Sequence, residues 1–84
     1  MQQGQQALAG GDISAARVAF RRLADAGNAE ATLTLAETYD PFYLAQQNVI
    51  GLSGDRATAK ELYERARELG STEADRMLAR LSEH

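Results

Sequence analysis

Two stretches of the chain decide its fold: GDISAARVAFRRLADAGNAEATLTLAET at residues 11–38 and GDRATAKELYERARELGSTEADRMLARL at residues 54–81. A shift of 43 residues aligns them without a gap, and nine of the 28 aligned positions are identical. The identities fall mainly on glycine, alanine and acidic residues, which are the types that end, pack and cap helices. We therefore predict two copies of one helical hairpin.

Each copy has the pattern of two helices. Apolar residues recur at spacings of three and four, which indicates helices with one buried face. Gly27 and Gly70 lie at the middle of the two copies, where a helix ends in a left-handed residue. The predicted helices cover residues 13–26, 29–39, 56–69 and 72–82. The predicted capping residues are Asp12, Asn28, Asp55 and Ser71.

The segment between the copies, residues 40–53, is too apolar to be a plain loop. Asp40 followed by Pro41 is typical of a cap and a first helical residue, so we predict a short helix over residues 41–47. Three apolar residues of this insertion either cover the core, which we favour, or form an exposed binding knob: Phe42, Tyr43 and Leu44. The first nine residues of the chain predict one more short helix.

Length and composition fit one helical domain. The 84 residues allow a single domain, with a first repeat at about 11–39, the insertion at 40–53 and a second repeat at about 54–82. The net charge of −3 argues against a nucleic-acid binder. No apolar run approaches the roughly 20 residues that span a bilayer, so no membrane span is expected.

The sequence offers little material for catalysis or metal binding. It contains no cysteine and one histidine, the terminal His84, so a nucleophile with an oriented base is not expected. The carboxylates of the helix at 56–69 alternate with basic residues four positions away, as on a solvated helix face. We therefore expect no enzyme, no metal and no cofactor. A small hydrolase using acidic residues would need two carboxylates in one closed pocket.

The spacing of the small and aromatic residues resembles the Sel-one-like repeat subfamily of tetratricopeptide-like proteins. The second repeat carries the pattern at Ala59, Tyr63, Ala66, Gly70, Ala74 and Leu78. The first repeat carries it at Ala16, Phe20, Gly27, Ala31, Leu35 and Tyr39, with Leu23 where the second has Ala66. The similarity covers residues 11–39 and 54–81, about two thirds of the chain. Ala36 and Ala79 stand where that family usually has glycine, and the 43-residue period is longer than the family's.

This resemblance implies an all-α fold, a right-handed α-α solenoid of about five helices. Its members hold other proteins as adaptors or scaffolds and use no cofactor. It further implies that the helices at about 1–9, 29–39 and 72–82 line a concave groove. The groove-facing residues carried over from the resemblance are Gln5, Glu30, Leu33, Glu37, Glu73, Arg76 and Arg80.

The expected function is therefore a protein-protein interaction module. Its partner is a protein or peptide, or the rest of a longer parent chain, and self-association is an open possibility because two repeats are fewer than the usual three. The alternative is a structural end-cap or spacer of a larger bacterial protein, with no ligand of its own.

Overall fold

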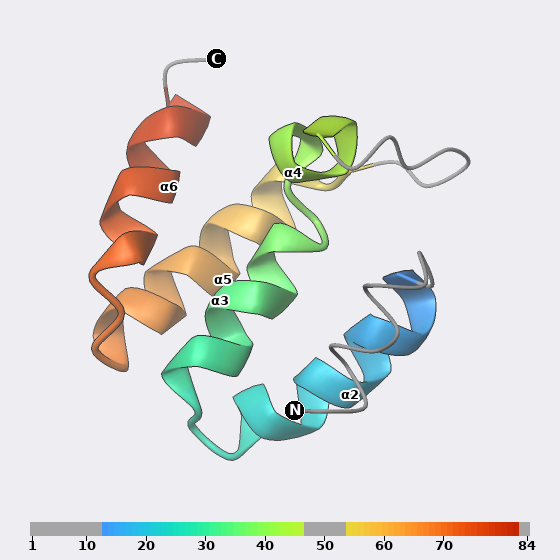
Figure 1. Cartoon of the computed structure of the whole chain (residues 1–84). Helices are drawn as coiled ribbons and strands as arrows, with labels where there is room; N and C mark the ends of the chain where they lie inside the picture. The colour runs from blue at the N-terminus through green and yellow to red at the C-terminus, as the bar shows by residue number, and fades with distance from the viewer. Residues whose placement is uncertain (1–12, 47–53, 83–84) are drawn as a thin grey trace.

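The computed structural model describes residues 13–46 and 54–82, and this part of the chain is all-helical. Its helices are α2 (Ile13–Asp25), α3 (Ala29–Glu37), α4 (Pro41–Gln46), α5 (Arg56–Glu68) and α6 (Glu73–Ser82) (Figure 1). The predicted ends of these five helices are confirmed to within two residues. The N-terminal helix, the cap at Asp12, the groove residue Gln5 and the second half of the insertion lie outside the described residues. No described helix combines the length and the apolar character that a membrane span needs.

The two hairpins share their glycine turns, and a capping side chain is formed in each of them at a different helix. Asn28 Oδ1 accepts the backbone N–H of Ala31 at 2.9 Å, and the Asp55 side chain caps α5 by accepting the N–H of Thr58 at 3.1 Å. Gly27 and Gly70 have φ angles of +90° and +109°, a left-handed conformation that costs other residues about 1 to 2 kcal/mol. Of the four predicted capping residues, Asn28 and Asp55 are confirmed and Asp12 lies outside the described residues. Ser71 does not directly precede α6, which begins at Glu73, so the prediction that it caps this helix is wrong. Both predicted glycine turns are confirmed.

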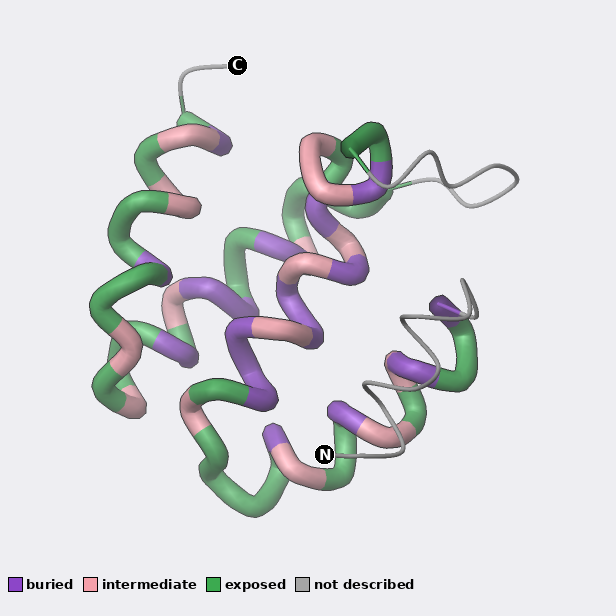
Figure 2. Tube along the Cα trace, viewed as in Figure 1, coloured by how far each residue is buried: buried purple, intermediate pink, exposed green. Residues whose placement is uncertain are grey.

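The helices pack in chain order. α3 lies between α2 and α5, and α5 packs against α6, while α2 and α6 lie on opposite sides of the molecule (Figure 1). Figure 2 shows the consequence, because α3 is buried along most of its length whereas α2 and α6 each keep an exposed face. Phe20 and Tyr63, which are equivalent in the two repeats, are both fully buried in one hydrophobic core.

The described half of the insertion folds onto this core. Leu44 is buried and Phe42 is half-buried and packed against the core, as the favoured interpretation of this segment predicted. Tyr43 is also half-buried. The second repeat starts beside the end of the first, because the N–H of Asp55 donates to the carbonyl oxygen of Tyr39 at 2.8 Å. α4 and the start of α5 thus meet at the C-terminal end of α3.

Candidate functional site

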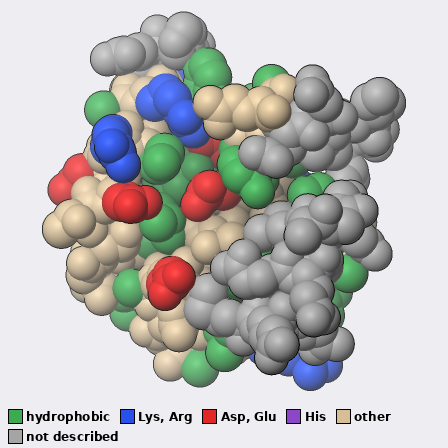
Figure 3. All heavy atoms as spheres, viewed as in Figure 1, with side chains coloured by type: hydrophobic (Ala, Val, Ile, Leu, Met, Phe, Trp, Pro, Cys, Tyr) green, Lys and Arg blue, Asp and Glu red, His purple; other side chains and the backbone are tan. Residues whose placement is uncertain are grey.

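A groove of about 490 Å³ lies between α3 and the turn that leads into α6. Its lining residues are Ala29, Glu30, Leu33, Thr34, Glu37, Gly70, Ser71, Thr72 and Glu73. In the space-filling view of Figure 3, acidic side chains lie around hydrophobic ones in the region between α6 and α3, and basic side chains adjoin them at the upper left. This size falls within the range of roughly 300 to 1,000 Å³ that is typical of ligand sites.

The groove brings together four of the predicted partner-binding residues. Glu30 and Glu73 are exposed at its rim, and Leu33, which is 8% exposed, belongs to the core below. Glu37 is half-buried. Glu30, Leu33 and Glu37 lie on α3 and Glu73 is the first residue of α6, so the groove joins these two helices.

The two predicted arginines are placed differently. Arg76 is exposed on α6 and does not line the groove. Arg80 does not line it either, because its guanidinium turns toward Asp40, 2.7 Å from Asp40 Oδ2. The groove is therefore more acidic than the sequence suggested, since neither predicted cation lies among its lining residues.

The electrostatics of the groove centre on Glu37. Burial, together with the negative charges of Glu73 and Asp40, raises the pKa of this carboxyl to about 7, against the opposing effect of Arg80. A carboxyl with such a pKa is partly protonated at neutral pH. A positive charge placed in the groove would favour the ionised form of the Glu37 carboxyl and would thus lower its pKa.

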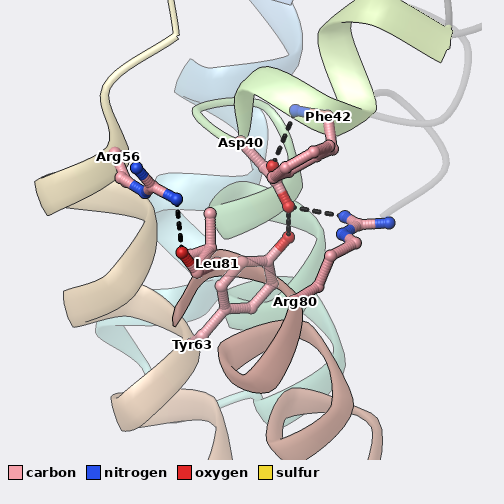
Figure 4. Close-up of polar contacts among 6 residues, drawn as sticks. All are labelled: Asp40, Phe42, Arg56, Tyr63, Arg80 and Leu81. Carbon is pink, nitrogen blue, oxygen red and sulfur yellow. Dashed lines mark hydrogen bonds and ion pairs between the residues drawn. The ribbon is translucent and has the colours of Figure 1, made fainter. Parts of the chain in front are cut away.

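A second polar arrangement, the Asp40 cluster, consists of Asp40, Tyr63 and Arg80 (Figure 4). Asp40 is fully buried. Its Oδ2 accepts hydrogen bonds from the Tyr63 hydroxyl and from Arg80 Nη2, each at 2.7 Å, and its Oδ1 accepts the N–H of Phe42 at 2.9 Å. Burial raises the pKa of Tyr63, and the hydrogen bond to Asp40 adds to that increase, so the phenol stays protonated and donates.

The Asp40 cluster ties three parts of the fold together. Asp40 precedes α4, Tyr63 lies on α5 and Arg80 lies on α6, so one carboxylate joins the insertion to both helices of the second repeat. Arg80 also lies over the Phe42 ring, with its central carbon 5.1 Å from the ring centroid. Sequence reasoning identified Asp40 only as a cap. The missed signal is the hydroxyl of Tyr63, because a buried tyrosine needs a hydrogen-bond partner that the equivalent Phe20 does not.

An arginine closes the end of each hairpin. Arg17 donates to Thr38 Oγ1 at 3.3 Å and to the Thr38 carbonyl, and stacks 3.9 Å from the Tyr39 ring centroid. In the second repeat Arg56 donates to the carbonyl of Leu81, the residue equivalent to Thr38. In both hairpins an arginine of the first helix thus donates to the carbonyl at the end of the second helix. The sequence alignment did not reveal this similarity, because Arg17 and Arg56 are not at equivalent positions.

The described residues contain no group of three or more histidine, cysteine, aspartate or glutamate side chains placed to hold a metal ion. The carboxylates of the groove are separate side chains on a surface open to solvent. The arrangement can bind a cationic and partly apolar segment through charge and burial.

Comparisons of the chain with protein-family models, with curated proteins and with solved structures found no match.

Proposed function

We propose that this chain is a protein-protein interaction module, an adaptor or scaffold built as a right-handed stack of Sel-one-like or tetratricopeptide-like hairpins. The proposal is supported by the internal repeat, by the left-handed glycines at equivalent positions of the two repeats, and by helices that pack in chain order. Binding by such a module needs shape and charge, with no cofactor.

The observation that carries this proposal is the groove. Glu30, Glu37 and Glu73 put three carboxylates around one concave site, and Leu33 contributes apolar surface between them. A partner segment with lysine or arginine next to an aliphatic residue is complementary to this arrangement in charge and in burial. We therefore propose that the partner presents a basic, partly apolar segment.

The test compares rim variants that leave the core intact. Glu30→Lys with Glu73→Lys reverses the charge at two exposed rim positions, and Glu61→Lys with Glu68→Lys makes the same charge change on α5 away from the groove. We expect the wild type and the α5 variant to capture the same proteins from native extract, and the rim variant to lose them. Their affinities are then measured with purified partner. Equal capture by the rim variant and the wild type would show that the groove is not the binding surface.

One observation favours the alternative, an end-cap of a larger helical assembly. Positions that α3 fills with buried Thr32 and Ala36 are occupied on α6 by exposed Asp75 and Ala79. Asp75 lies 3.6 Å from Arg67 in an exposed ion pair. Terminal repeats of helical stacks carry such polar outer faces, which prevent further stacking.

The end-cap alternative has its own test. Asp75→Leu with Ala79→Leu should give concentration-dependent self-association in size-exclusion chromatography with light scattering, because it replaces the polar outer face of α6 by an apolar one. The wild type provides the baseline, including any self-association of its own. A variant that behaves like the wild type at every concentration would count against a capping role for this face.

A further inference from the structure

A second concave site, here called the hollow, lies between the start of α5 and the end of α6 and has a volume of about 420 Å³. Its lining residues are Arg56, Ala57, Lys60, Leu78, Leu81 and Ser82. None of them lines the groove. The hollow has an apolar floor with two basic side chains at its edge, and the proposed function makes no use of it.

The internal repeat supplies a reference for this site. A shift of 43 residues places the six lining residues on Ile13, Ser14, Arg17, Leu35, Thr38 and Tyr39. In the first repeat this surface is largely closed, because Ile13, Leu35 and Thr38 are at most 3% exposed. Its outer part is an aromatic ring, with the Arg17 guanidinium 3.9 Å from the Tyr39 centroid.

The second repeat lacks that aromatic ring. Ser82 stands at the position of Tyr39, and Arg56 stands at the position of Ile13. Leu78, equivalent to the fully buried Leu35, is half-buried. Leu35 is covered by α5, whereas no described helix packs on the outer side of α6, and Ser82 adds no ring at the position of Tyr39. The apolar surface of Leu78 therefore stays open at the place where the first repeat holds a ring.

The first repeat also indicates which charge belongs beside the ring. Asp55 donates its N–H to the carbonyl of Tyr39, so an aspartate stands next to the residue on which Arg17 stacks. In the second repeat, Lys60 occupies the position of Arg17, and Arg56 lies next to it across one turn of α5. Within the described residues neither Arg56 nor Lys60 takes part in an ion pair. A carboxylate is the complementary group.

The size of the occupant follows from the surroundings of the hollow. Asp75 and Ala79 are exposed on the same helix, so the outer face of α6 is not the continuous apolar surface that a further packed helix needs. A single aromatic side chain requires only the hollow. We propose that the hollow is a docking site for a tyrosine or phenylalanine side chain of a partner protein that carries an aspartate or glutamate next to it.

The first experiment fills the hollow from within the chain. Ser82→Tyr with Lys60→Arg rebuilds the pair that Arg17 and Tyr39 form in the first repeat, and should raise the Tm by at least about 4 °C. Ala79→Tyr is the matched control, because it places the same ring at an exposed position of α6 outside the hollow, and should leave the Tm within about 1 °C. Equal Tm values for the rebuilt and control variants would overturn the proposal.

The second experiment supplies the ring from outside, with N-acetyl-Asp-Tyr-amide as the probe. Saturable shifts of the Ala57, Lys60 and Leu81 amide signals are expected at millimolar probe in nitrogen-proton correlation spectra. N-acetyl-Asp-Ala-amide should bind at least fivefold more weakly, and so should N-acetyl-Lys-Tyr-amide. Ser82→Tyr should abolish the shifts, whereas Glu30→Lys in the groove should leave them unchanged. Absence of saturable shifts, equal binding of the alanine probe, or unchanged binding to folded Ser82→Tyr would each refute the proposal.

Discussion

The Asp40 cluster allows one prediction to be worked out in detail. Tyr63→Phe removes a single hydroxyl from a side chain that is fully buried, and keeps the ring that fills the core. The deleted hydrogen bond, 2.7 Å long, runs to the buried carboxylate of Asp40. Asp40 keeps Arg80 and the N–H of Phe42 as partners, so no charge is left without compensation. Hydrogen bonds to charged groups contribute about 1.5 to 3 kcal/mol, and we expect Tyr63→Phe to lower the free energy of unfolding by that amount.

The assay is urea unfolding followed by circular dichroism at constant pH. A loss of this size should lower the urea concentration at the midpoint of unfolding. The dependence of the free energy of unfolding on urea concentration should stay constant, because the ring still packs in the core and unfolding exposes the same surface area. Tyr43→Phe is the matched control, since Tyr43 is half-buried on α4 and its hydroxyl donates no hydrogen bond to another described residue. It should change the free energy of unfolding by less than about 0.5 kcal/mol.

A double-mutant cycle sharpens the test. Arg80→Met should cost about 3 to 5 kcal/mol, because it removes the ion-pair partner of a buried charge. Both donors use the same oxygen of Asp40, so the double variant should differ from the sum of the single variants by more than about 0.5 kcal/mol. A loss below about 0.5 kcal/mol for Tyr63→Phe, or strict additivity in the cycle, would refute the reasoning that Asp40 joins the insertion to both helices of the second repeat.

Three further predictions concern pH, the core and the turns. The folded pKa of Glu37, about 7, exceeds its ordinary value of 4.5, so the folded protein binds the extra proton and the free energy of unfolding should fall as pH rises from about 5 to about 8. Glu37→Gln should flatten that dependence in urea titrations, and an unchanged slope would contradict it. Leu35→Ala should lower the free energy of unfolding by about 2 to 5 kcal/mol because Leu35 is fully buried, and Leu78→Ala should lower it clearly less because Leu78 is half-buried. Equal losses of the two variants in denaturant unfolding would be inconsistent with an open outer face on α6. Gly27→Ala and Gly70→Ala should each lower the free energy of unfolding by about 1 to 2 kcal/mol in the same measurement, because alanine is strained in the left-handed conformation. Nothing lies within 4 Å of the added carbon, so a steric clash is not the cause. A neutral result would mean that the left-handed turns are not retained.

The helices could be predicted from the sequence because their signals are local. The periodicity of α2 and α5, the caps at Asn28 and Asp55 and the left-handed glycines depend only on residues a few positions apart. The family resemblance implied that the helices at 29–39 and 72–82 line one groove. Four of the seven residues carried over from it line a groove, but Arg76 and Arg80 on α6 do not.

The polar contacts could not be predicted in the same way. Arg80 was assigned to the groove by the family resemblance, yet its guanidinium pairs with Asp40. That pairing joins residues 40 positions apart and has no counterpart in the first repeat. The stacking of Arg17 on Tyr39 joins α2 to a residue that follows α3 and was not predicted either. Long arginine side chains reach several partners, so their contacts depend on packing that a sequence pattern does not specify.

The central claim is that the helices form an open stack in which α2 and α6 stay apart, so that α3 and α6 present one groove. Spin labels test it most directly, because the chain has no cysteine and labels can be placed at Val18→Cys on α2 and Arg76→Cys on α6, both exposed positions. With neighbouring helix axes about 8 to 10 Å apart and two helices between the labelled ones, the account predicts a single interlabel distance longer than about 20 Å. A main distance near 10 Å, as for adjacent helices of a closed bundle, would contradict it.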